Sequence, residues 1–99
     1  MAQYDLHPDQ AGNGCLLDVQ SDLLEGLNVR TMVPLLLQNN SPVAASRLNP
    51  TFEVDGASHV MMTQYIAAVP LSIPKEPFGD LSEQSDAITS ALDMLFHGF

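Results

Sequence analysis

Alternating and periodic apolar positions divide the chain into a strand-rich first part and one helix near residue 99. The clearest pattern begins at Asp80 or Ser82, where a helix-starting residue is followed by apolar side chains at helical spacing. These side chains are Ile88, Ala91, Leu92, Leu95, Phe96 and Phe99. Ala87 and Met94 flank this stripe and widen it. The pattern therefore predicts an amphipathic helix that can contact more than one surface.

The first fifth of the chain has the pattern of a β-hairpin. Tyr4 and Leu6 alternate in a short first strand, and residues 15–20 form a second strand. Between them, residues 8–14 contain a proline, two glycines and an Asn-Gly step, which favour a turn or loop.

The connector at residues 21–28 places two leucines side by side. Ser21 can cap a single helical turn there, and Gly26 can end it. Leu23 and Leu24 cannot easily both point into one core, so we expect one of them to be exposed.

Residues 29–37 form an apolar stretch that contains Pro34. Proline has no amide donor, so we predict a bent strand at an edge or bulge rather than a central one. The polar, proline-containing residues 38–50 predict a long loop, which in a small domain is often functional or mobile.

A second hairpin is predicted in the middle of the chain. Residues 51–54 alternate, the Asp55-Gly56 step is a strong turn signal, and residues 58–62 return as the second strand. Strands followed by one C-terminal helix predict an α+β fold that is mainly β.

Length and charge narrow the function. The 99 residues suffice for one domain, residues 1–99, with one core. Twelve acidic residues outnumber three basic ones, Arg30, Arg47 and Lys75, for a net charge of −9. Duplex binding needs clustered cations, so we expect no direct nucleic-acid binding. The acidic surface favours solubility or a basic protein partner.

Targeting and redox signals are also weak. Cys15 is the one cysteine, so the chain has no internal disulfide framework. The N-terminal residues 1–5 show neither a basic nor an apolar signal region, and the apolar runs are too short for a membrane span. We therefore expect a cytoplasmic protein that does not associate with membranes.

No catalytic motif stands out, so we expect a protein that is not an enzyme. His7, His59 and His97 lie far apart in sequence, and no Cys pair or His-Glu-x-x-His pattern indicates a metal. Cys15 has no neighbouring base in sequence to activate it, so it is interpreted as a strand residue.

Several segments taken together resemble the CcdB family of toxins. They are Leu17-Asp18-Val19-Gln20-Ser21-Asp22-Leu23-Leu24, Arg30 with Met32-Val33-Pro34-Leu35, Met61-Met62-Thr63 with Val69-Pro70, Asp80-Leu81-Ser82 with Ile88, and Phe96-His97-Gly98-Phe99. No single segment is specific for the family, but the order and spacing of the segments over residues 15–99 are specific for it. The first 14 residues match poorly.

The resemblance implies a fold and a function. The family has an SH3-like antiparallel barrel with a small extra sheet and a C-terminal α-helix, and it acts as a homodimer without a cofactor. Its members belong to plasmid-type type II toxin–antitoxin systems, bind the A subunit of DNA gyrase and trap the cleaved DNA complex. A cognate antitoxin neutralises them, with contacts that include loops near residues 8–14 and 39–46.

The resemblance also implies a gyrase-binding site centred on the end of the helix. Its residues are His97, Gly98, Phe99, Phe96, Asp93, Leu23 and Leu24. The family's best-known pattern has tryptophan where this chain has His97. A smaller ring that can be protonated predicts gyrase binding that is weaker, pH-sensitive or directed at a different gyrase. The alternative is a frayed helix end without contacts.

Two other functions remain open at this point. Ribonuclease toxins of the MazF and Kid type share the barrel, but three basic residues are a poor basis for an RNA cleft. An inactive relic would keep antitoxin binding and lose gyrase poisoning because of His97. Within the fold, we expect Arg30 to form a structural ion pair with an acid such as Asp18, Pro34 to set a strand bend, and Met61-Met62 to pack in a core or dimer interface.

Overall fold

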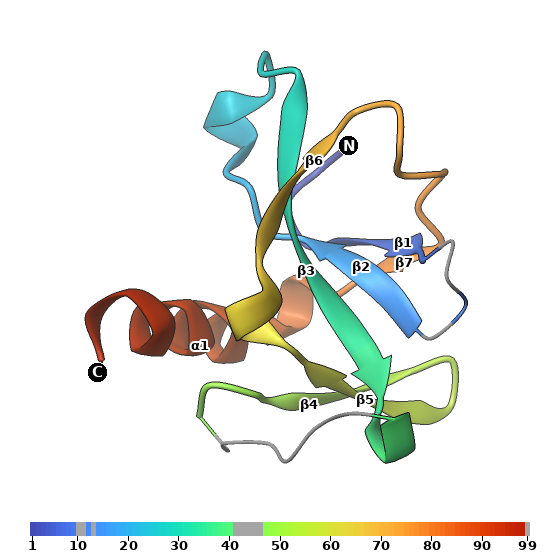
Figure 1. Ribbon diagram of the computed structural model, residues 1–99, viewed down its shortest axis with the longest axis vertical. Helices are drawn as coiled ribbons and strands as arrows, with labels where there is room; N and C mark the ends of the chain where they lie inside the picture. Colours follow the sequence, from blue (N-terminus) through green and yellow to red (C-terminus); the bar gives the residue numbers. More distant parts are fainter. Residues whose placement is uncertain (10–11, 13, 41–46, 99) are drawn as a thin grey trace.

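A curled antiparallel sheet with one long helix forms the framework of the protein (Figure 1). The computed structural model describes residues 1–9, 12, 14–40 and 47–98. The strands are β1 (Asp5–Pro8), β2 (Gly14–Asp18), β3 (Val29–Leu37), β4 (Thr51–Val54), β5 (Ala57–Met61), β6 (Ala67–Pro70) and β7 (Gly79–Asp80). The helix is α1 (Ser85–His97), and single 3₁₀ turns form at η1 (Asp22–Leu24), η2 (Gln38–Asn40), η3 (Thr63–Tyr65) and η4 (Ser82–Gln84).

The strand order within the described residues is β4-β5-β3-β2-β1-β7, with β6 also paired to β3. Every pairing is antiparallel. The sheet curls into a half-barrel, and the fold is α+β and mainly β, as the strand pattern and the resemblance predicted. None of the helices described has the length and apolar character needed to cross a membrane.

The predicted position of Pro34 at an edge was wrong, because β3 lies in the middle of the sheet. One side of β3 pairs with β2 over residues 32–36, whereas the other side changes partner along its length. Residues 29–32 pair with β6 and residues 35–37 pair with β5. Pro34 falls between these two ladders, and its carbonyl accepts the N–H of Met62 at 2.9 Å. The amide that proline lacks would face this gap, so no ladder hydrogen bond is lost.

Both predicted hairpins form, and glycine is required at each. At the β4–β5 turn, Asp55 and Gly56 have φ angles of 52° and 81°, the left-handed pair that a tight hairpin turn needs. At the start of β2, Gly14 has φ 150°, and a Cβ there would overlap the carbonyl oxygen of Leu35. The sheet therefore closes on β3 at this point only because residue 14 has no side chain.

The core lies on the concave side of the sheet and is closed by the first half of α1. Leu6, Leu17 and Val33 form one row across β1, β2 and β3, and each is buried. Ile88 and Ala91 of α1 are fully buried in the same cluster. The i, i+3 spacing of these two helix residues is the pattern that predicted the helix.

Asp80 orders the turn η4, which comes just before the helix. Its Oδ1 atom accepts hydrogen bonds from the backbone N–H of Ser82 at 3.0 Å and from the Ser82 hydroxyl at 2.6 Å. These two hydrogen bonds lower the pKa of the Asp80 carboxyl. Along the chain, η4 comes directly before α1, which begins at Ser85.

The two halves of the helix stripe should contribute differently to stability. Ile88→Ala removes a fully buried side chain and should lower the free energy of unfolding by about 2–5 kcal/mol. Phe96→Ala removes a side chain that is 63% exposed and should change it by less than about 1 kcal/mol. Urea denaturation at low protein concentration measures both. Equal losses would show that Phe96 packs against the body of its own chain.

Candidate functional site

The second half of α1 leaves the body of the protein. Figure 1 shows the helix extending away from the sheet toward its C-terminal end. Ile88 and Ala91 are buried, yet Met94 is 38% and Phe96 is 63% exposed. The apolar stripe predicted from the sequence thus continues beyond the core. An apolar helix face without a covering element is a feature of surfaces that bind another protein.

The helix ends in a left-handed cap at Gly98. This residue has φ 78° and ψ 13°, and its N–H donates to the carbonyl of Met94 at 3.1 Å. A Cβ at Gly98 would meet open space, so the constraint on a side chain is the backbone conformation and not a local clash. His97 and Asp93 are exposed beside this cap. Phe99, also predicted for the site, lies outside the described residues.

The second part of the predicted site is the leucine pair on η1. Leu23 is 94% exposed and Leu24 is 50% exposed. The sequence pattern led us to expect one exposed leucine, and the structure exposes both. A nearly fully exposed leucine on an ordered turn contributes little to folding, which leaves this side chain accessible to a partner.

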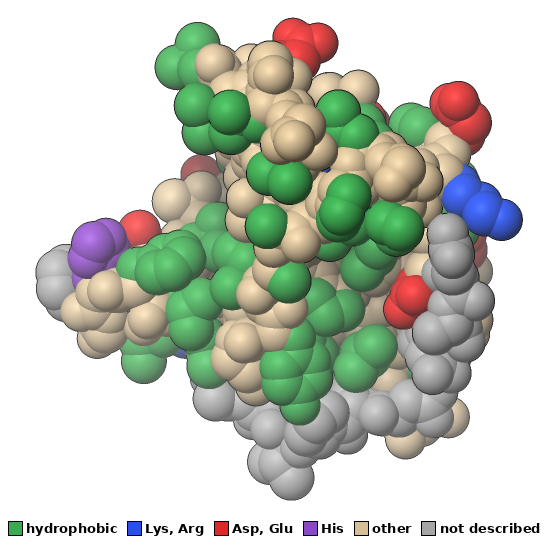
Figure 2. All heavy atoms as spheres, turned by 45° about the horizontal axis from the view of Figure 1, so that its top comes forward, with side chains coloured by type: hydrophobic (Ala, Val, Ile, Leu, Met, Phe, Trp, Pro, Cys, Tyr) green, Lys and Arg blue, Asp and Glu red, His purple; other side chains and the backbone are tan. Residues whose placement is uncertain are grey.

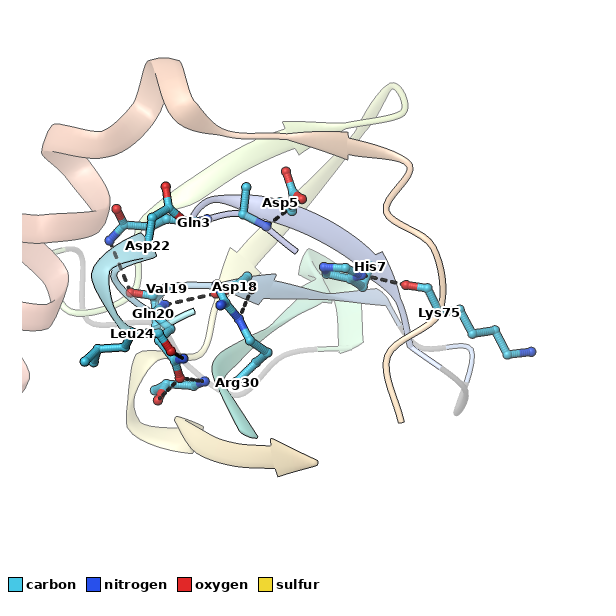
Figure 3. Close-up of polar contacts among 12 residues, drawn as sticks. Gln3, Asp5, His7, Asp18, Val19, Gln20, Asp22, Leu24, Arg30 and Lys75 are labelled. Atoms are coloured by element: carbon cyan, nitrogen blue, oxygen red, sulfur yellow. Dashed lines mark hydrogen bonds and ion pairs between the residues drawn. The ribbon is translucent and has the colours of Figure 1, made fainter. Parts of the chain in front are cut away.

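The side chains of Ser21 and Gln20 hold η1 in its position. The Ser21 hydroxyl accepts the N–H of Leu23 at 3.2 Å, which caps the turn as predicted. Gln20 donates from Nε2 to the carbonyl of Leu24 at 3.1 Å and accepts the N–H of Thr31 on Oε1 at 3.0 Å. One amide therefore joins the exposed turn to strand β3 (Figure 3).

A buried ion pair stabilises the backbone from which η1 projects. Arg30 Nε donates to Asp18 Oδ2 at 2.7 Å, and both side chains are essentially inaccessible to solvent. The other oxygen of Asp18 accepts the N–H of Gln20 at 3.0 Å. The hydrogen bond to Asp18 raises the pKa of the Arg30 guanidinium, and nearby carboxylates add to this effect against the opposing cost of burial. The predicted ion pair of Arg30 is confirmed.

The sequence analysis missed the role of Gln20. It placed this residue at the end of the second predicted strand, residues 15–20, without a role. Gln20 lies just beyond the end of β2, is 4% exposed, and has its amide hydrogen-bonded to Leu24 and Thr31. The signal that could have identified it is the polar sequence Asp18-Val19-Gln20 opposite Arg30 on the next strand. A run of this kind indicates a buried polar network when both strands are central.

The exposed apolar side chains of the described chain extend well beyond the helix end. Figure 2 shows them across one face of the molecule, with few charges among them. Large apolar residues with considerable exposure include Leu23, Leu24, Leu27, Tyr65, Leu71, Ile73, Met94 and Phe96. A small monomer rarely exposes so many, so this surface is suited to protein contacts.

One chain does not bring the two parts of the predicted site into contact. In Figure 1, η1 lies near the top of the molecule and the C-terminal end of α1 lies at the lower left. A partner that touches both must therefore span the distance between them, or meet them on two copies of the chain.

The histidines and the cysteine do not form a reactive centre. In the part of the chain that the structure describes, no group of His, Cys, Asp and Glu side chains is placed to hold a metal ion. His7 Nδ1 lies 2.6 Å from the Lys75 carbonyl, and His59 Nδ1 lies 2.9 Å from the Ala57 carbonyl. Burial, followed by the charges of Asp55 and Asp9, raises the pKa of the Cys15 thiol to about 12. Cys15 is thus an inert core residue.

Comparison with known families decides the identity. The sequence model of one family, described as CcdB protein, matches residues 3–98. The chain belongs to the CcdB family. It is therefore the toxin of a toxin–antitoxin system. The match includes the first residues, where the motif-based resemblance was poor.

In this CcdB-family toxin, loss of the buried carboxylate should be costly. Asp18→Ala leaves Arg30 buried without its counter-charge, and we expect the free energy of unfolding to fall by about 3–5 kcal/mol. Urea denaturation followed by circular dichroism measures this loss. Glu76→Gln, an exposed carboxylate, is the matched control and should stay within about 0.5 kcal/mol of the parent. A loss below about 1 kcal/mol for Asp18→Ala would show that the pair is not an anchor.

The thiol of this toxin should be protected by the fold. At pH 8 we expect iodoacetamide to label native Cys15 at least about a hundredfold more slowly than the urea-unfolded chain, because a pKa of about 12 leaves little thiolate. Since the native pKa lies above that of a free thiol, this group destabilises the native state as the pH rises above about 8.5. Ser58→Cys adds an exposed thiol as the control. Equal labelling of both thiols would contradict the buried environment.

Proposed function

We propose that this CcdB-family toxin binds the A subunit of DNA gyrase through the C-terminal end of α1 and traps the cleaved DNA–gyrase complex. The observation that carries the proposal is the helix stripe, which is buried at Ile88 and Ala91 and continues, uncovered, to Phe96. The left-handed Gly98 cap then ends the helix without a side chain, which permits close approach of a partner backbone.

The residues proposed to contact gyrase are those at the helix end and on η1. Phe96 offers a large apolar contact, and an aromatic side chain of this kind buries on the order of 150–250 Å². Leu23 and Leu24 add a second apolar contact on a turn held in place by Gln20. His97, Gly98, Phe99 and Asp93 complete the proposed site. Neutral His97 can stack on a gyrase side chain, whereas protonated His97 would repel a cation there.

We further propose that the toxin acts without catalysis and as a homodimer. Two copies related by a two-fold axis would present two helix ends together, and a second copy could place η1 of one chain near α1 of the other. The exposed apolar face in Figure 2 offers the surface for such contacts. A cognate antitoxin would neutralise this dimer.

The charge distribution disfavours a ribonuclease. Of the three basic residues, Arg30 is 1% exposed and is committed to Asp18. Arg47 donates to the Ser90 hydroxyl at 2.9 Å on the side of α1. A cleft for RNA needs several accessible cations that follow the phosphates, and the described surface is mainly acidic and neutral.

The tail proposal is tested by induced expression in bacteria together with a gyrase cleavage assay. We expect growth arrest and linearised plasmid with the intact chain. Deletion of residues 97–99, or Gly98→Glu, should weaken gyrase trapping at least about 30-fold, as loss of a binding hot spot does. Ser58→Glu adds the same charge at an exposed position of β5 and should leave trapping unchanged.

The outcomes separate the alternatives. Trapping that survives deletion of the tail, with a folded protein by circular dichroism, would refute the tail site. Arrest with RNA cleavage and without trapped gyrase would favour the ribonuclease. Absence of arrest with intact antitoxin binding would identify an inactive relic.

A further inference from the structure

A cavity of about 300 Å³ lies at the end of the half-barrel opposite α1. Figure 1 shows the helix on one side of the sheet and the elements around the cavity, the β4–β5 turn and the segment before β7, on the other. Its main lining side chains are Cys15, Leu37, Val54, Asp55, His59 and Phe78. We refer to this cavity as the barrel mouth. A cavity of this size is at the small end of the range for ligand pockets.

The barrel mouth combines apolar walls with one buried hydrogen-bond acceptor. The ring of His59 is only 7% exposed, and its Nδ1 atom lies 2.9 Å from the Ala57 carbonyl. Because a carbonyl only accepts, Nδ1 carries a proton, and in the neutral ring Nε2 offers a lone pair.

His59 Nε2 has no hydrogen-bond partner within the described chain, yet it is not sealed from the surface. The unpartnered side-chain nitrogens that are fully enclosed there are His7 Nε2 and Arg30 Nη2. His59 also lines the barrel mouth, so the cavity lies next to this ring. A buried acceptor without a donor is a point at which an incoming ligand gains a hydrogen bond.

The charged groups nearest the described lining of the barrel mouth are carboxylates. Asp55 stands exposed at the rim, on the left-handed turn between β4 and β5. The negative charges of Asp55 and Asp9 both contribute to the raised pKa of Cys15 in the cavity wall. Among the described residues of the lining there is no lysine or arginine, and the whole chain carries a net charge of −9. An anionic ligand is thereby excluded, and a cation is favoured.

We infer that the barrel mouth binds an arginine side chain from a basic segment of a partner protein. The aliphatic stem fits the apolar wall formed by Leu37 and Val54. The guanidinium can donate to His59 Nε2 and to the Asp55 carboxylate, and it can stack on the face of Phe78. An apolar side chain would leave His59 Nε2 desolvated, and an ammonium group lacks the planar fork that serves two acceptors.

The natural source of this arginine in a toxin–antitoxin pair is the antitoxin. That assignment rests on the proposed function, whereas binding of arginine to the barrel mouth does not. The site lies away from α1 and η1, so it does not depend on the gyrase-contact residues proposed above.

The test is an NMR titration of the ¹⁵N-labelled full chain with Nα-acetyl-arginine amide. The matched probe is Nα-acetyl-citrulline amide, which has nearly the same shape and no charge. We expect the arginine probe to shift the amide signals around Cys15, Asp55 and His59, and the citrulline probe to bind at least about fivefold more weakly.

Two variants locate the effect. Asp55→Asn removes the rim charge and keeps a residue type that tolerates the φ of 52°, and it should weaken arginine binding about fivefold. Glu53→Gln removes an exposed carboxylate from β4 outside the cavity and should leave binding unchanged.

The inference is overturned if citrulline binds equally well, if both variants weaken binding alike, or if the shifts fall on α1 instead. Arginine binding in a chain that does not arrest growth would refute the gyrase proposal and leave the barrel mouth standing. Growth arrest and gyrase trapping by a chain that does not bind arginine would support the gyrase proposal and refute the inference about the barrel mouth.

Discussion

The buried ion pair between Asp18 and Arg30 is the constraint on which the exposed turn depends. A carboxylate and a guanidinium that are both excluded from water must each find a partner, so β2 and β3 are held in one register. The second oxygen of Asp18 fixes the backbone of Gln20, whose side chain in turn holds η1. A polar network of this kind can cost stability relative to an apolar core, but it allows few alternative arrangements. The result is a rigid turn that displays Leu23, a side chain that the fold itself does not need.

Much of the fold could be predicted from local patterns. The stripe from Ile88 onward indicated the helix, and the Asp55-Gly56 step indicated the β4–β5 turn, because each pattern reflects forces between near neighbours. The position of β3 could not be predicted in the same way. Pro34 is compatible with a central strand only because β6 ends and β5 begins at the same point along β3. That exchange of partners depends on the path of residues far away in the sequence, and nothing near Pro34 reveals it.

The residues of the candidate site also differ in how far the sequence could predict them. The helix end and the leucine pair were named from the resemblance to the family, and the uncovered half of the helix stripe gives them a physical basis in exposure. The sequence indicated only part of the polar network beneath them. Arg30 could be expected to need a counter-charge, but nothing in the sequence showed that Gln20 is buried. Nothing in the sequence indicated the barrel mouth. Its residues come from β2, β3, the β4–β5 hairpin and the segment before β7, and no spacing in the sequence connects Cys15, His59 and Phe78.

The two ends of the half-barrel differ in chemistry, and this difference bears on how an antitoxin could act. The end that carries α1 offers exposed apolar side chains, and the opposite end offers a cavity with an acidic rim. If the gyrase contact uses the first end, a basic antitoxin segment held at the second end can bind while the toxin is still attached to gyrase. Such a segment gives the rest of the antitoxin a high effective concentration near the helix. The antitoxin then competes with gyrase for the helix within one complex. The toxin can therefore be displaced from gyrase before it dissociates spontaneously.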